Sequence, residues 1–277
     1  MSTTGWTNAL GTGNWGTNGN WTASAPANGS EVQILATATA GDILLGLGQS
    51  GVYVNSIHIQ PGFRGNIGAS GTPLEIRANR IIHEGRGKLW FDSGVAATSD
   101  VLIAAGHHDA AWIDGYVTRL SVLKGVVDTG SSFATTDATQ VFVGYIRNVA
   151  KDAKVTLNGS RVLRDVLVYG GTCEVTNSAA VEVRVHGGSY THNDTGTLTR
   201  LYMSRGTTTC KGITTIGGAF VCGGTLDCSV DAELKTIQQL HLLPAATFLP
   251  NANTTVTAPT DGPLAGSIWG ILAGLRP

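Results

Sequence analysis

The chain has 277 residues, of which 42% are hydrophobic, enough for a continuous core, so an intrinsically disordered chain is excluded. Charged residues make up only 13%, and the 38 glycines are about twice the usual share of ~7%, a composition that favours turn-dense β structure over helices. The formal net charge of -1 gives no reason to expect nucleic acid or a membrane as a partner.

Residues 1–30 differ from the rest of the chain. They carry Trp6, Trp15 and Trp21 among Gly, Asn and Thr, and Pro26 with a polar turn leads into a first predicted strand, EVQIL. We expect an aromatic cap over the first turn of a stacked structure, because such a structure must cover its open hydrogen-bonding edge. The start lacks the positive and apolar regions of a secretory signal, so we expect no export by the ordinary route.

The middle of the chain repeats one template, a short alternating apolar segment followed by glycine and a second β-like segment. The glycines that close the first segments are Gly62, Gly85, Gly106, Gly125, Gly144, Gly170, Gly187, Gly206 and Gly223, at spacings of 23, 21, 19, 19, 26, 17, 19 and 17. Short strands recurring at about 20 residues are typical of a β-helix, in which each coil stacks on the last at ~4.8 Å.

We therefore predict an all-β, single-stranded parallel β-helix over residues 31–245, with roughly nine to ten coils. Val, Ile and Leu would face inward and Thr, Arg and Asn outward. Glycine suits the corners because a sharp bend needs a positive φ or a close backbone approach. A β-sandwich or jelly roll is the alternative. Residues 231–243 fit either helical spacing or two strands.

Residues 246–277 are expected to leave the column as an extended C-terminal arm, because three prolines precede an apolar segment. This segment is far shorter than the ~18 to 20 residues that cross a bilayer. We expect it to dock on another protein, since no further coil covers it. The candidate docking residues are Ile268, Trp269, Ile271, Leu272 and Leu275.

The opening GNWGTNGNWTASAPANGSEVQI resembles a pattern that often begins β-helical passengers of bacterial autotransporters and certain tailed-bacteriophage virion proteins. The matching positions are Trp15, Asn20, Trp21, Pro26, Gly29, Val32 and Ile34. The autotransporter family implies a signal peptide and a C-terminal membrane barrel, and neither is expected here. The phage family requires neither, so the resemblance implies a virion protein that assembles in the host cytoplasm.

Cys173, Cys210, Cys222 and Cys228 contain no CxxC pair and no histidine at zinc-finger spacing, so no metal is expected there. We expect the four thiols to face a narrow core, although an even number also permits disulfides.

Other motifs also favour structural over chemical interpretations. The GLGQSG string at Gly46, Gly48 and Gly51 matches a dinucleotide fingerprint, but a strand follows it instead of the required helix. His107, His108 and Asp109 form the densest group of metal-capable side chains, yet adjacent strand residues point to opposite faces, which indicates a solvated turn. His83 with Glu84, and His186, lie beside corner glycines and are expected to face water.

A polysaccharide-cleaving tailspike is the alternative function, because two carboxylates ~5 to 9.5 Å apart could lie on neighbouring coils. The acidic residues between the cap and the arm show no shared offset that defines such a pair. They include Glu75, Glu84, Asp92, Asp100, Asp109, Asp114, Asp128, Asp137, Asp152, Asp165, Glu174 and Glu182.

The sequence therefore predicts a structural protein without a catalytic site or cofactor. Its role would be to decorate or cement a phage capsid, or to form part of a head or tail fibre, as a homotrimer in contact with the major capsid protein or other virion proteins. A bacterial surface adhesin is a further alternative.

Overall fold

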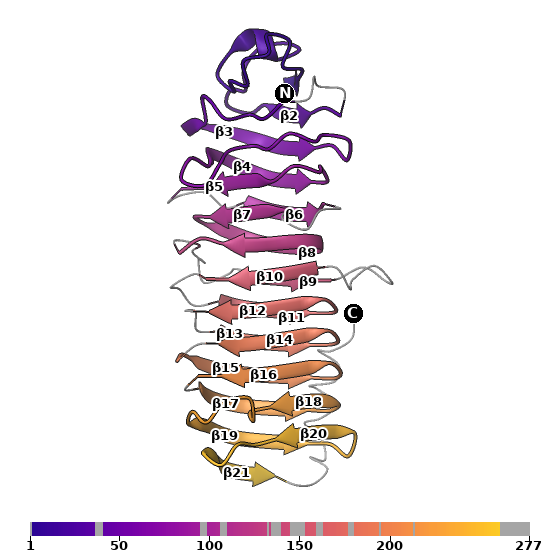
Figure 1. Cartoon of the computed structure of the whole chain (residues 1–277), viewed down its shortest axis with the longest axis vertical. Helices are drawn as coiled ribbons and strands as arrows, with labels where there is room; N and C mark the ends of the chain where they lie inside the picture. The colour runs from indigo at the N-terminus through magenta and orange to yellow at the C-terminus, as the bar shows by residue number, and fades with distance from the viewer. Residues whose placement is uncertain are drawn as a thin grey trace.

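The structure is a computed structural model that describes residues 2–36, 41–94, 99–105, 110–131, 133, 140–144, 153–158, 163–176, 180–193, 195–212 and 214–260. Its strands are parallel and stack into a β-solenoid of about nine turns, which confirms the predicted fold class and rules out the β-sandwich. Figure 1 shows the strands stacked along the long axis, from the indigo N-terminal segment to the yellow β21.

Two series of strands build the column. The first series contains β1 (Thr3–Trp6), β2 (Glu31–Ile34), β3 (Gly48–Ile59), β4 (Leu74–His83), β6 (Ser99–Ala104), β8 (Val117–Thr129), β9 (Gln140–Val143), β11 (Leu163–Val168), β13 (Ala180–Val185), β15 (Thr197–Met203), β17 (Thr214–Val221), β19 (Lys235–Leu242) and β21 (Thr254–Thr260). The second contains β5 (Leu89–Asp92), β7 (Ala111–Asp114), the second half of β8, β10 (Ala153–Leu157), β12 (Thr172–Thr176), β14 (Ser189–Asn193), β16 (Thr207–Lys211), β18 (Gly224–Asp227) and β20 (Ala246–Leu249).

The length of a rung changes along the column. The successive partners Lys154, Thr172, Ser189, Thr207 and Thr225 follow one another at 18, 17, 18 and 18 residues. At the N-terminal end the step is longer, with Thr3 opposite Glu31 and Glu31 opposite Ser56, because longer connections separate these strands. The predicted repeat of about 20 residues is therefore an average over short and long rungs.

Alternation along each strand creates the core. On successive rungs Val166, Val183, Leu201 and Ala219 are partners and are all buried. The residues that follow Val183, Leu201 and Ala219 are also partners and point away from the core: Arg184, Tyr202 and Phe220. His241 is the next partner after Phe220, and the rings of Tyr202, Phe220 and His241 lie nearly parallel. Identical environments thus stack on one another, which is the expected consequence of in-register parallel pairing.

Glycine is required at the corners of the later rungs. Gly206 has a φ of +84°, and a Cβ there would lie 2.5 Å from the carbonyl oxygen of Gly188. A Cβ on Gly188 or on Gly224 would likewise lie too close to the carbonyl oxygen of a glycine on the preceding rung. Only glycine combines a left-handed conformation with such a close approach. Of the predicted corners that the structure describes, Gly125, Gly144 and Gly206 have positive φ; at Gly170, Gly187 and Gly223 the glycine that follows has it instead.

The column continues past residue 245, where the arm was expected to begin. Strands β20 and β21 extend both series in parallel, because Thr225 pairs with Thr247 and Ile237 pairs with Val256. Residues 231–243, which fitted either helix or strand, contain β19. In the described part of the chain, no helix is long and apolar enough to cross a membrane.

Candidate functional sites

The predicted tryptophan cap closes the N-terminal end of the column. The ring of Trp21 packs edge-on against both Trp6 and Trp15, with centroids 5.0 and 4.9 Å apart, and all three side chains are buried. The Trp21 Nε1 donates a hydrogen bond of 2.7 Å to the carbonyl oxygen of Trp15. The cap also adds a rung, because β1 pairs in parallel with β2.

Asn20 holds the cap loop in place, a role that the sequence pattern did not reveal. Its side chain is fully buried, and its Nδ2 donates hydrogen bonds to the Thr12 hydroxyl and the Asn14 carbonyl oxygen. Its Oδ1 accepts one from the backbone N–H of Leu10. A buried amide with its hydrogen bonds satisfied fixes one loop conformation.

A hollow of about 750 Å³ lies beside the cap, between residues 8–13 and 41–45. Three leucines on its lining are exposed, Leu10 by 59%, Leu44 by 45% and Leu45 by 56%. Asp42 contributes a charge to the same lining. Grouped exposed leucines differ from the scattered apolar residues of an ordinary surface and mark a candidate contact surface.

The C-terminal candidate docking residues lie outside the described residues; they are Ile268, Trp269, Ile271, Leu272 and Leu275. The last described rungs expose Val230, Leu234 and Leu249, by 45%, 51% and 41%. Apolar side chains are therefore exposed near both ends of the described column.

A second hollow, of about 300 Å³, lies on the flank of the early rungs. Its lining includes Glu75, Arg77, Asp92 and Ser93. Glu75 is the strand partner of Asp92, and Asp92 is the partner of Asp114 on the next rung. Three carboxylates therefore stand in register, one per rung. Sequence reasoning missed this arrangement because the steps, 17 and 22 residues, are unequal.

Two carboxylates of this in-register series, Asp92 at the hollow and Asp114 on the next rung, accept local hydrogen bonds. Asp92 Oδ1 accepts a hydrogen bond of 2.7 Å from the backbone N–H of Gly94, and Asp114 Oδ1 accepts one of 3.0 Å from Gly115. Asp114 is 7% exposed, whereas Glu75 is exposed. The carboxylates of this series therefore differ in their exposure to solvent.

Asp165 and Glu182 are a second in-register carboxylate pair. Glu182 forms ion pairs with Arg184 and Arg200, and the Asp165 Oδ2 accepts a hydrogen bond from Gln140. These arginines and the glutamine neutralise or occupy the carboxylates. The pair is consequently a stabilising network on the outer face of the sheet.

His83 corrects one expectation. Its side chain is 1% exposed, and its Nε2 lies 3.0 Å from the carbonyl oxygen of Ala110, so it is a core residue and does not face water. The alternation of β4 points position 83 inward.

The other residues beside corner glycines lie nearer the surface. The Glu84 Oε2 lies 2.7 Å from the His58 Nε2. His186 is half-buried and stacks on Tyr169; burial, then the charge of Arg184, lowers its pKa.

The remaining motifs give a mixed result. The GLGQSG string runs into β3, the strand that was predicted there, at a position where a dinucleotide site would need the start of a helix. His107, His108 and Asp109 lie outside the described residues. Within the described residues no three His, Cys, Asp or Glu side chains are grouped to hold a metal ion.

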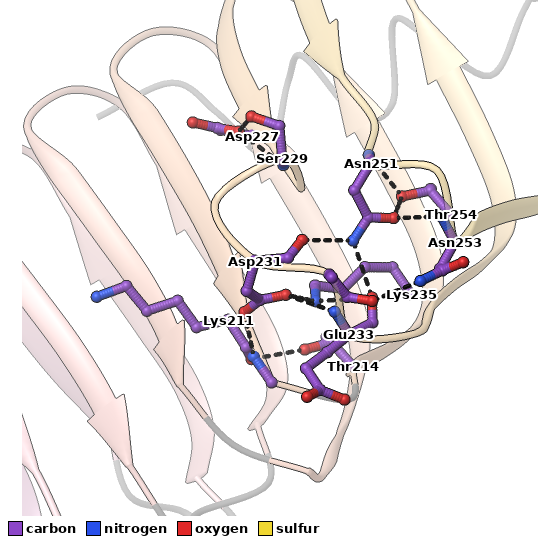
Figure 2. A network of polar contacts seen from close by, with 12 residues as sticks. Lys211, Thr214, Asp227, Ser229, Asp231, Glu233, Lys235, Asn251, Asn253 and Thr254 are labelled. Atoms are coloured by element: carbon purple, nitrogen blue, oxygen red, sulfur yellow. Dashed lines mark hydrogen bonds and ion pairs between the residues drawn. The ribbon is translucent and has the colours of Figure 1, made fainter.

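A polar network surrounds Lys235 near the C-terminal end of the column (Figure 2). The Lys235 side chain is 1% exposed, yet its Nζ lies 2.5 Å from the Asp231 Oδ1 and donates to the Glu233 carbonyl oxygen at 3.2 Å. The Asn251 Nδ2 donates to the carbonyl oxygens of Asp231 and Glu233, both at 2.8 Å. These bonds hold the 228–234 turn against the next rung.

The cysteines follow the core prediction in part. Cys173, Cys210 and Cys228 are buried, whereas Cys222 is half-exposed, and all four are free thiols. Cys210 and Cys228 lie on neighbouring rungs and are joined by a thiol hydrogen bond. The charge of Lys235 acts on both thiols.

The fold and these sites define the protein as a parallel β-solenoid with a tryptophan-capped N-terminal end. Comparisons with family models, with curated proteins and with solved structures found no match.

Proposed function

We propose that the protein is a structural component of a tailed-bacteriophage particle, located in the virion, where it decorates or cements the capsid or forms part of a fibre. The observation that carries the proposal is the continuous column. The first series of strands forms a parallel hydrogen-bonded ladder from Thr3 to Thr260, so force applied at one end passes through backbone hydrogen bonds to the other. The resemblance of the cap segment to phage virion proteins favours the same role.

Attachment would use the ends of the column. The leucines around the hollow beside the cap are one candidate surface, and the segment that contains Trp269 is the other. Contacts of this kind bury apolar residues at a centre surrounded by polar ones. The partner would be the major capsid protein or another virion protein, and the protein itself would be a homotrimer by analogy with other phage β-helices.

Particle incorporation tests the proposal. Wild-type protein should sediment with purified particles at a fixed copy number, and a chain lacking residues 261–277 should fold but incorporate at less than a tenth of that level. Incorporation of the double variant Leu10→Asp, Leu44→Asp, measured in the same way, tests attachment through the surface beside the cap. Normal incorporation of both variants would refute attachment through the ends, and wild-type protein found only free of particles or on the bacterial surface would refute the virion role.

Polysaccharide cleavage is a second candidate, favoured by the in-register carboxylates of Glu75 and Asp92 beside the flank hollow. Neighbouring rungs are ~4.8 Å apart, close to the ~5 to 5.5 Å between the carboxylates of a retaining glycosidase. Release of reducing sugar from capsular polysaccharide would support it if Glu75→Gln and Asp92→Asn abolish the release and Asp100→Asn, a change of an exposed carboxylate outside the hollow, does not. The absence of release from host capsules would leave the structural role.

A further inference from the structure

Cys210 and Cys228 are placed one above the other in the column. Thr209 pairs with Asp227, and the next residue on each rung is a cysteine. Both side chains are fully buried, and the backbone N–H of Cys228 continues the ladder by donating to the Leu249 carbonyl oxygen at 2.8 Å. Neighbouring parallel strands lie ~4.8 Å apart, within the range of about 4.4 to 6.8 Å over which the Cα atoms of a disulfide are found.

The surroundings of the two thiols favour Cys228 as the nucleophile and Cys210 as the thiol that reacts with it afterwards. A hydrogen bond from Cys210 lowers the pKa of Cys228; burial opposes this, and Lys235 adds to it. The same hydrogen bond raises the pKa of Cys210, and burial raises it further. The charged groups that act on Cys228 are Lys235, Asp227 and Asp231. A thiol whose pKa is lowered by a neighbouring thiol is the better nucleophile of the two, and its neighbour can resolve the oxidised form as a disulfide.

We propose that Cys210 and Cys228 are a redox modification site, at which a small peroxide closes a disulfide between two successive rungs. The Cys228 sulfur attacks one peroxide oxygen; the O–O bond breaks, and hydroxide leaves and takes up a proton as water. The Cys210 sulfur then attacks the sulfenic acid sulfur of Cys228, whose hydroxyl leaves as water with the thiol proton. Two thiols and one hydrogen peroxide thus give one disulfide and two water molecules, with both sulfurs oxidised and both peroxide oxygens reduced.

The disulfide would clamp the later rungs of the column. It would close a loop that contains the whole of β17, whose pairing with β15 and β19 holds this part together. A crosslink between successive rungs restricts the unfolded chain and should raise the melting temperature by several degrees. Adding a reductant should reverse the rise.

Peptide mass spectrometry of folded full-length protein treated with hydrogen peroxide tests the proposal. Trypsin releases residues 206–211, with Cys210, and residues 212–235, with both Cys222 and Cys228. The assay is therefore run in a Cys222→Ser background. We expect the two peptides to be joined, with a loss of about 2 Da relative to the reduced pair, and the link to be absent from Cys210→Ser and Cys228→Ser.

Cys173 is the internal control, because it is as buried as the pair. It should stay a free thiol while the pair oxidises. Oxidation of Cys173 at the same rate would overturn the proposal, since the reaction would then report unfolding. Failure to form the link in the Cys222→Ser protein, at peroxide levels that oxidise Cys222 in the wild type, would also overturn it.

Discussion

The ion pair of Lys235 and Asp231 shows how a single position can bear on stability. The lysine is 1% exposed and the aspartate 29%, so the two partners differ in access to water. If Asp231 is changed to Asn, the lysine charge stays buried without its partner, whereas after Lys235→Met the aspartate can be hydrated. We expect Asp231→Asn to lower the free energy of unfolding by about 3 kcal/mol and Lys235→Met to lower it by less.

Urea unfolding of both variants measures this difference. The double variant Asp231→Asn, Lys235→Met should be more stable than Asp231→Asn alone, because it removes the unpaired buried charge. Equal losses in the two single variants would mean that the ion pair is effectively solvated.

Acid should weaken the same network. Partial burial raises the pKa of Asp231, but the hydrogen bonds from Lys235, Gly212 and Glu233 outweigh it and hold the pKa below its ordinary value of about 3.9. A lowered pKa in the folded state adds stability above the unfolded value, which is lost as the pH falls through the folded value. Wild type should therefore lose stability below about pH 4 more steeply than Asp231→Asn. Parallel denaturation curves of the two proteins from pH 6 to 2 would contradict this.

At the scale of the element, the corners of the column are the most constrained positions. Gly206 and Gly71 both have positive φ, +84° and +79°, but a Cβ on Gly206 would meet the Gly188 carbonyl oxygen at 2.5 Å, and one on Gly71 would meet nothing within 4 Å. Changing Gly71 to Ala should lower the free energy of unfolding by about 1 kcal/mol, because only the conformational penalty of a positive φ applies there. Changing Gly206 to Ala should cost at least twice that, because the rungs must also separate.

Thermal or urea unfolding of the two variants gives the comparison. The matched φ values make Gly71→Ala the control for conformational strain. If both substitutions cost the same, close stacking of the glycine corners does not limit the column.

The tryptophan cap should stabilise the first rungs of the column. Trp21 packs between two other indoles and is 5% exposed, so Trp21→Ala should cost about 3 to 5 kcal/mol. Trp90→Ala is the control. Trp90 is half-exposed on β5 beneath Lys88, so its replacement should lower the free energy of unfolding by less. Hydrogen exchange should report the loss first in β1 and β2. Exchange that rises equally along the whole chain would show that the cap does not act locally.

Much of this element-level structure was predictable, because periodic glycines and alternating apolar residues are local signals. Gly206 and its neighbours follow from the requirement for a sharp corner, and the burial of three tryptophans follows from the open edge. Register was not predictable. The steps from Glu75 to Asp92 and from Asp92 to Asp114 depend on loop lengths, so the carboxylate series became visible only in the structure. The buried His83 was missed for a related reason, since proximity to a corner glycine did not reveal which way the residue points.

At the scale of the whole molecule, the column connects form to the proposed role. Each rung contacts chiefly its neighbours, so stability is a sum of local terms and the two ends need protection. The cap provides it at the N-terminal end, and the continuation of β20 and β21 through Thr260 extends the body beyond the boundary expected at residue 245. The contact segment proposed around Trp269 would then follow a longer column than the sequence predicted.

Electron cryomicroscopy of purified particles, compared with particles from a strain in which the gene for this chain is deleted, tests the structural role most directly. We predict slender densities with rungs ~4.8 Å apart, attached to the particle by one end and absent from the deletion strain. Identical densities in the two samples, with the protein recovered only outside particles, would contradict the proposed role.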